Sequence, residues 1–198
     1  HIAGTNGKGS MAQMFSEVFR CAGLKTGLFT SPYIISYTDR IKINGVDIPK
    51  SALAKMAKRV KAVTDMHGDR ENFSQFEITT AIAFLYFAEE NCDIVVLETG
   101  LGGLLDSTNV IKTPVLTVIG SVDFDHTAIL GDTLEKIAYQ KAGIIKPHCP
   151  CVLSAGNDMK VIRTVREQAV KNLSQLVIPD LNQLRLKSCD VFGSEFEF

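Results

Sequence analysis

The sequence predicts an α/β protein in which a mostly parallel, doubly wound sheet is covered by helices on both faces. Short apolar runs such as Asp93–Leu97 and Val115–Ile119 are typical of strands that are buried on both sides. Segments with apolar residues at helical spacing lie between these runs, so strands and helices alternate along the chain. This alternation indicates a parallel sheet, because each helix carries the chain across one face of the sheet to the next strand.

The chain begins with Ile2 and Ala3, which we interpret as the tail of a strand whose beginning is absent. A helix is predicted next, with Gly23 as its stop signal. Its apolar residues recur at helical spacing: Met11, Met14, Phe15, Val18, Phe19 and Ala22. Residues Thr26–Thr30 then form a short predicted strand that leads into a Ser-Pro loop.

Two further helices are predicted before the Asp93–Leu97 strand. Pro49 opens the first of them, whose inward-facing residues are expected to be Leu53, Met56, Ala57 and Val60. The basic residues of this helix are interpreted as a solvated face rather than a nucleic-acid patch: Lys50, Lys55, Lys58, Arg59 and Lys61. Ser74 begins the second helix, which is strongly apolar through Phe87.

The second half of the chain continues the alternation. Helices are predicted at Thr133–Gln140 and Asp158–Lys171, with strands near Val152 and Val177. Residues 192–198 alternate apolar and polar side chains, as at the start of another strand. We find no internal repeat, low-complexity segment or flexible linker in the sequence.

Composition narrows the class of protein. A chain of 198 residues with 45% hydrophobic residues is large enough for one globular core, and its net charge of −1 provides no field for nucleic acid. No apolar run approaches the roughly 20 residues of a membrane span, and no signal peptide is visible. The odd set of five cysteines forms no metal-ligand array and is interpreted as reduced: Cys21, Cys92, Cys149, Cys151 and Cys189. We therefore expect a soluble cytoplasmic protein.

A glycine-rich loop follows the first strand and precedes the first helix. It consists of Gly4, Thr5, Asn6, Gly7, Lys8, Gly9 and Ser10. Glycines let backbone amides approach phosphate oxygens, and a helix that starts there adds free N–H groups. Lys8 can neutralise phosphate charge, and the Ser10 hydroxyl can reach Mg²⁺. Because Gly9 separates Lys8 from Ser10, the loop departs from the usual phosphate-loop spacing.

A second loop, Glu98–Asn109, begins directly at the end of the Asp93–Leu97 strand. A carboxylate at this position, beside a phosphate loop, is suited to binding Mg²⁺. The rival interpretation is a dinucleotide-binding turn of a dehydrogenase. It fails because Leu105 occupies the position of the third glycine, and because that motif normally opens the first βα unit.

A third loop, Asp123–Thr127, follows the Val115–Ile119 strand and carries His126. A lone histidine is usually structural, but at this edge of the sheet its imidazole can complete a metal site. Lys141 lies farther along, at the end of a predicted helix. There it is either a cation favoured by the helix dipole or a functional residue.

Seven runs occur in the order and spacing typical of one enzyme family. They are Gly4–Ser10, Thr30-Ser31-Pro32, Arg40-Ile41, Phe76-Glu77, Glu98–Asn109, Asp125-His126 and Lys141–Lys146. On these motifs the chain resembles the folylpolyglutamate and dihydrofolate synthases of the Mur ligase superfamily. The resemblance covers nearly all of residues 2–146. It implies that residues 1–198 are the ATP-binding central domain, truncated at both ends, without the C-terminal domain that helps bind ATP and the amino acid.

The resemblance also implies the reaction. A folate or dihydropteroate carboxylate attacks the γ-phosphorus of ATP, giving an acyl phosphate and ADP. The amino group of L-glutamate then displaces phosphate. The implied partners are these small molecules, with no nucleic acid or membrane, and the enzyme is expected to be a monomer.

The family match assigns the charged part of the site as follows. Lys8 and two Mg²⁺ ions supply positive charge, with Ser10 and Glu98 holding the first ion. The second ion is assigned to Ser31, Glu98 and His126. Lys141 matches a lysine that is carbamylated in this family, and it is counted with Lys8 and His126 as catalytic.

The substrate side is assigned in the same way, to Phe76, Glu77, Leu105, Asp106 and Ser107. Glu77 has a second interpretation, because Ser74-x-x-Glu77 is a capping box that closes a helix.

Three positions depart from the family pattern: Tyr33 replaces a usual histidine, Asp39 a usual glutamate, and Leu104 a common arginine. None of these positions belongs to the phosphate loop or to the proposed metal ligands, so the departures bear on the substrate rather than on the ATP chemistry. Three alternatives stay open: another Mur-type amide ligase, a non-catalytic nucleotide-binding module, and a small-molecule kinase with a phosphate loop.

Overall fold

The computed structural model describes residues 1–66, 73–191 and 193–198. Its strands are β1 (Ile2–Ala3), β2 (Thr26–Phe29), β3 (Ile41–Ile43), β4 (Val46–Asp47), β5 (Ile94–Leu97), β6 (Thr117–Ile119), β7 (Cys151–Leu153), β8 (Leu176–Val177), β9 (Arg185–Asp190) and β10 (Gly193–Glu197). Its α-helices are α1 (Lys8–Cys21), α2 (Lys50–Met66), α3 (Gln75–Glu89), α4 (Thr127–Leu130), α5 (Leu134–Ala142) and α6 (Met159–Lys171). Short 3-10 helices are η1 (Tyr37–Arg40), η3 (Ser107–Val110) and η4 (Leu181–Gln183).

The main strands form two four-stranded sheets that meet edge to edge, in the orders β4-β3-β2-β5 and β1-β6-β7-β8. A parallel bridge between Ile2 and Glu98 joins them, and the Thr99 amide donates to the Ile2 carbonyl at 2.9 Å. Strands β2, β5, β1, β6, β7 and β8 are parallel, whereas β3 and β4 pair antiparallel at one edge. The predicted mostly parallel α/β sheet is therefore confirmed.

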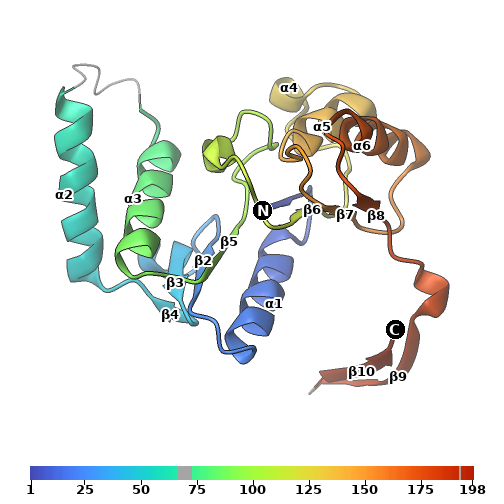
Figure 1. Cartoon of the computed structure of the whole chain (residues 1–198), viewed down its shortest axis with the longest axis horizontal. Helices are drawn as coiled ribbons and strands as arrows, with labels where there is room; N and C mark the ends of the chain where they lie inside the picture. Colours follow the sequence, from blue (N-terminus) through green and yellow to red (C-terminus); the bar gives the residue numbers. More distant parts are fainter. Residues whose placement is uncertain (67–72, 192) are drawn as a thin grey trace.

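Helices cover both faces of the sheet, because successive strand residues point to opposite sides. Ile2 and Leu28 pack with Ala12 of α1 in one core cluster. Phe29 packs with α2 and α3 on the opposite face, and Ile119 packs with α5 and α6 there. Figure 1 shows α2 and α3 beside one half of the sheet and α5 and α6 beside the other half.

Helix α1 begins at Lys8 after Gly7, whose φ of 74° is the left-handed conformation that glycine adopts without steric cost. Its buried positions are Ala12 and Ser16, whereas Met14 and Val18 are mostly exposed. The helix predicted from apolar spacing is therefore confirmed. Of its apolar residues, Met11, Phe15 and Phe19 pack against the core cluster, whereas Met14 and Val18 do not.

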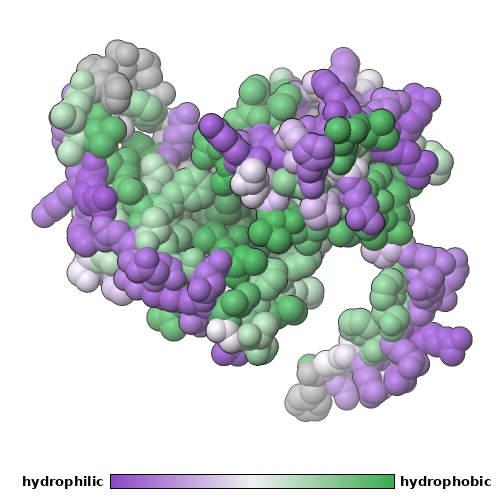
Figure 2. Space-filling view, viewed as in Figure 1, coloured by the Kyte–Doolittle hydropathy of each residue, from purple (hydrophilic) through white to green (hydrophobic). Residues whose placement is uncertain are grey.

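The predicted inner face of α2 is confirmed: Met56 and Val60 are buried. The basic side of this helix forms ion pairs at the surface, such as Lys55 with Glu89 at 2.7 Å. Figure 2 shows hydrophilic side chains along α2, as expected for a solvated face. In the ranges that the structure describes, no helix has both the length and the apolar character needed to cross a membrane.

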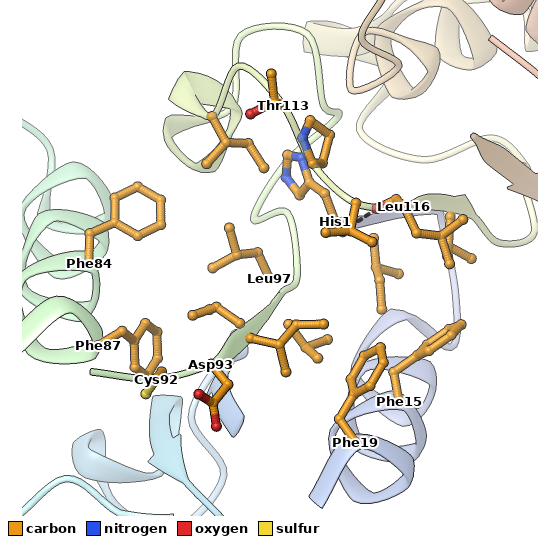
Figure 3. A pocket seen from close by; sticks show the side chains of 18 of the residues that line it. His1, Phe15, Phe19, Phe84, Phe87, Cys92, Asp93, Leu97, Thr113 and Leu116 are labelled. Carbon is orange, nitrogen blue, oxygen red and sulfur yellow. Dashed lines mark hydrogen bonds between the residues drawn. The ribbon is translucent and has the colours of Figure 1, made fainter. Parts of the chain in front are cut away.

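The predicted buried strands β5 and β6 are shorter or less buried than expected. Strand β6 starts at Thr117, and Val115 is 78% exposed. Ile94 and Val95 of β5 are only half-buried, because they line an apolar cavity of about 450 Å³. Figure 3 shows phenylalanines of α1 and α3 on opposite sides of this cavity. It lies at the amino ends of β5 and β6, away from the polar loops.

Strands β9 and β10 form an antiparallel hairpin whose residues are exposed, and Figure 1 shows it apart from the main sheet. The predicted strand at 192–198 corresponds to β10. Its first position, Phe192, lies outside the described residues.

We predict that Phe29→Ala lowers the free energy of unfolding by about 3–5 kcal/mol, because it empties a fully buried ring position. Phe124→Ala is the matched control, since Phe124 is 58% exposed and its loss should cost less than about 1 kcal/mol. The chain contains no tryptophan, so urea unfolding is followed by circular dichroism. Equal losses in the two variants would contradict the assignment of the core.

Candidate active site

The loops that leave the carboxyl ends of β1, β2, β5 and β6 surround one cavity of about 970 Å³. This edge of a parallel sheet is where α/β proteins bind ligands. Predicted site residues that line it are Thr5, Asn6, Lys8, Ser31, Phe76, Leu105, Asp106, Ser107 and His126. The structure therefore brings together most of the residues that the sequence suggested.

The phosphate loop is held by the loop after β6. The Thr5 amide donates to the Ser121 carbonyl at 2.6 Å, and the Asp123 amide donates to Thr5 Oγ1 at 3.0 Å. Lys8 Nζ donates to the Thr5 carbonyl at 3.1 Å and lines the cavity. The first amides of α1 have no acceptor within the helix, so they are available to an anion.

Glu98 connects the phosphate loop with the loop after β2. Its side chain is buried, and Oε2 accepts a hydrogen bond from the Ser31 amide at 3.0 Å. A Cβ on Gly9 would lie 3.5 Å from the same oxygen, which shows how closely α1 approaches this carboxylate. Burial raises the pKa of Glu98, while the Ser31 amide and the charge of Lys8 act in the opposite direction.

Lys141 lies in the last turn of α5, as predicted, but it is not a solvated helix-end cation. It is only 1% exposed, and Nζ donates to the Gly4 carbonyl at 2.8 Å. Burial lowers the pKa of Lys141 to about 8; Lys8 acts in the same direction, and Asp125 opposes it. Its burial and its hydrogen bond to Gly4 distinguish it from a lysine that serves only as an exposed charge at a helix end.

Phe76 supplies an aromatic wall. Its ring packs against Phe29 with centroids 5.8 Å apart, and it lines the cavity. Gly100 lies directly against this ring, because a Cβ there would be 2.5 Å from the Phe76 Cζ atom. The loop after β5 can approach the ring only with glycine at this position.

Asp106 lines the cavity, but its carboxylate organises the loop around it. Oδ2 accepts from the Leu101 amide at 2.8 Å, and Oδ1 accepts from the amide and hydroxyl of Thr108. Neighbouring Leu105 is 88% exposed at the cavity wall. Leu105 and Ser107 are therefore more available to a ligand than the Asp106 carboxylate is.

Glu77 is the predicted substrate residue that the structure does not bring to this cavity. Its carboxylate accepts from the Ser74 amide and hydroxyl, which completes the capping box of α3. Glu77 instead lines a separate, mostly apolar cavity of about 560 Å³ with residues of α2 and α3. This placement supports the helix-capping interpretation.

Of the proposed metal ligands, Ser31 and His126 line the cavity, whereas Ser10 and Glu98 do not line it. Ser10 is in the exposed first turn of α1, and His126 has its Nε2 3.4 Å from Asp125 Oδ1. Over residues 1–66, 73–191 and 193–198, no three His, Cys, Asp or Glu side chains form a ligand cluster. Glu98 is the one carboxylate among the four proposed ligands. A single carboxylate fits Mg²⁺, which uses one or two carboxylates together with phosphate and water oxygens.

Several residues that line the cavity are not predicted as site residues from the sequence: Pro32, Arg40, Phe124, Ile129 and Gln140. Arg40 belongs to the Arg40-Ile41 motif, but the sequence assigns it no role. The Ser-x-x-Asp pattern before it, at residues 36–39, is a capping box that could have indicated the short helix η1.

Comparison with known proteins supports one family. The model of the Mur ligase middle domain matches residues 2–185. The dihydrofolate synthase/folylpolyglutamate synthase of Bacillus subtilis is 43% identical over 198 residues, which cover 98% of this chain and 44% of that protein. The chain thus spans under half the length of this relative.

Two solved structures with ligands are similar along almost the whole chain. An FPGS–AMPPCP–folate complex has a TM-score of 0.91 at 36% identity, over 99% of this chain and 48% of that one. Escherichia coli FolC in complex with DHPP and ADP has a TM-score of 0.80 at 28% identity, over 98% and 46%. The chain therefore belongs to the Mur ligase middle-domain family, and the relatives that it matches here are folylpolyglutamate and dihydrofolate synthases.

Proposed function

We propose that this chain is the ATP-binding part of a ligase that joins L-glutamate to the carboxylate of folate or dihydropteroate. One observation carries the proposal: the phosphate loop Gly4–Ser10 and the aromatic wall at Phe76 face a single cavity. Relatives bearing these activities, and related structures with nucleotide and folate or DHPP, support it. We further propose that the rest of the protein supplies a second domain, which completes the glutamate site.

The reaction requires two anions to meet. The acceptor carboxylate attacks the γ-phosphorus of ATP, the bond to the β-phosphate oxygen breaks, and acyl phosphate and ADP form. The amine of glutamate then attacks the acyl carbon, and phosphate leaves as the amine loses a proton. Lys8 and the first amides of α1 reduce the repulsion in the first step, because they place positive charge where the γ-phosphate is held.

Mg²⁺ held by Ser10, Ser31, Glu98 and His126 would neutralise phosphate charge. Glu98 is positioned for this role by the Ser31 amide, which fixes one carboxylate oxygen. On the acceptor side, Phe76 offers a ring face to a flat pterin, and Leu105 and Ser107 border it.

Carbamylation of Lys141 is part of the proposal. A neutral amine attacks CO₂, a C–N bond forms, and the displaced proton goes to solvent, which leaves a negatively charged carbamate. With its pKa lowered to about 8, more of the Lys141 amine is neutral near neutral pH than in an ordinary lysine. The carbamate would support the bound cations near the phosphate loop, whereas an ammonium would repel them.

Phosphate release by the complete protein, with ATP, glutamate and either dihydropteroate or tetrahydrofolate, tests the function. We expect release to require both acceptor and glutamate. Lys8→Ala should abolish phosphate release, because the ammonium neutralises phosphate charge. The variant should keep its fold, because the Lys8 side chain is partly exposed. Lys58→Ala, on the exposed side of α2, is the matched control.

The alternatives give different results in this assay. A kinase would transfer phosphate to one acceptor without glutamate, and a nucleotide-binding module would show no turnover. Near-normal phosphate release by folded Lys8→Ala would remove the assignment of the phosphate loop.

A further prediction compares two proposed metal ligands. Glu98→Gln should reduce kcat/KM by about 100-fold or more. His126→Ala should reduce kcat/KM less, because Glu98 is assigned to both ions and His126 to one. Added Mg²⁺ should restore His126→Ala better than Glu98→Gln. Equal losses with equal rescue, or a nucleotide-bound structure with Mg²⁺ far from both side chains, would contradict the assignment.

The third prediction concerns Lys141. Lys141→Arg should lose activity, because arginine keeps a permanent charge and cannot form a carbamate. A small carboxylic acid or bicarbonate should partly restore Lys141→Ala. The activation of the wild type by bicarbonate should increase as the pH rises through about 8. The lowered pKa makes the neutral amine available in that range, whereas an ordinary lysine, with a pKa of 10.5, becomes neutral only at higher pH.

Electron density at the tip of Lys141 is the direct readout, because a carbamate is lost in acid. An unmodified amine at neutral pH, together with a fully active Lys141→Arg enzyme, would make Lys141 a structural residue.

A further inference from the structure

Arg40 is a cation held in place at the wall of the active-site cavity. Its carbonyl accepts from the Thr30 amide at 2.9 Å, which attaches it to the end of β2. The guanidinium carbon lies 5.2 Å from the centre of the Tyr33 ring and 5.5 Å from that of Tyr37. Both distances are within the range of cation–π attraction, so the two rings hold the guanidinium in one position.

The two tyrosines are themselves supported. Their ring centroids are 6.0 Å apart, and the Tyr37 hydroxyl makes a hydrogen bond to Thr79 Oγ1 on α3. The Tyr33 ring is about half exposed, at the surface side of Arg40.

Among the residues that the structure describes, no ion pair involves Arg40. Adjacent Asp39 does not compensate for its charge, because Asp39 Oδ2 accepts from the amides of Ile34, Ile35 and Ser36. The Arg40 charge at the cavity wall is therefore open to an anion that enters the cavity.

Arg40 lines the cavity on the side of α3, which also carries Phe76, the ring assigned to the acceptor. Tyr37, which contacts the Arg40 guanidinium, hydrogen-bonds to Thr79 one turn along α3 from Phe76. The planar fork of a guanidinium matches a carboxylate, to which it can donate two parallel hydrogen bonds. We propose that Arg40 binds the carboxylate of the acceptor and brings it toward ATP. This inference rests on the proposed function, since that function supplies an acceptor with a carboxylate.

Kinetics of the complete protein separate three possible anions. In Arg40→Gln we expect the acceptor KM to rise about 10- to 100-fold, as for loss of hydrogen bonds to a charged group. The KM values for ATP and glutamate should change less than about twofold. A larger rise for ATP or for glutamate, or an unchanged acceptor KM in a folded variant, would overturn the inference.

Matched variants report on the geometry. Arg40→Lys keeps the charge without the fork and should fall between wild type and Arg40→Gln. Tyr33→Leu should raise the acceptor KM, because it removes one of the two rings that hold the guanidinium. Arg163→Gln on exposed α6 is the control for loss of an arginine, and circular dichroism verifies the fold of each variant.

Binding provides a readout that does not need turnover. Dihydropteroate and its neutral methyl ester are titrated into the protein with a non-hydrolysable ATP analogue. Wild type should bind the acid more tightly than the ester, and Arg40→Gln should reduce this ratio by about tenfold or more. An undiminished ratio would refute the role of Arg40. If the wild type showed no ligase activity, the proposed function would be refuted. The titration would still test whether Arg40 binds the carboxylate.

Discussion

Strand β1 joins the two halves of the sheet through the bridge between Ile2 and Glu98. The same pairing places the phosphate loop, which follows β1, against the carboxylate that follows β5. Because parallel strands end at one edge, a shift in this register would separate Glu98 from Gly9. The approach of the phosphate loop to Glu98 therefore depends on this contact, whereas Ser31 is held near Glu98 by the pairing of β2 with β5.

Positive charge is concentrated around the cavity. Lys8 and Lys141 approach the phosphate loop from α1 and α5, and Arg40 stands on the acceptor side. Mutual repulsion and burial are costly, and they explain why the pKa of Lys141 is lowered. Bound anions would offset this cost in free energy. Binding sites commonly lower the stability of the free protein in this way.

The carboxylates in the loops and helix starts near the cavity have different hydrogen-bond partners and therefore different roles. Asp39 and Asp106 bind backbone amides and thereby shape the two loops that border the acceptor side. Glu77 closes the first turn of α3, and Glu98 keeps Oε1 without a hydrogen bond from the described residues. These roles follow from which amides each side chain meets in space, and residue type alone does not distinguish them.

The sequence by itself determined the α/β class, the alternation of elements and the identity of the three polar loops. These features are local, because apolar periodicity and glycine-rich turns are properties of neighbouring residues. Only the tertiary structure decided that Met14 faces solvent, that Lys141 is buried against Gly4, and that Arg40 lies beside the rings of Tyr33 and Tyr37. Lys141 and Gly4 are 137 positions apart in the chain. Burial and partner choice at such separations are set by the packing of whole elements, which no local pattern encodes.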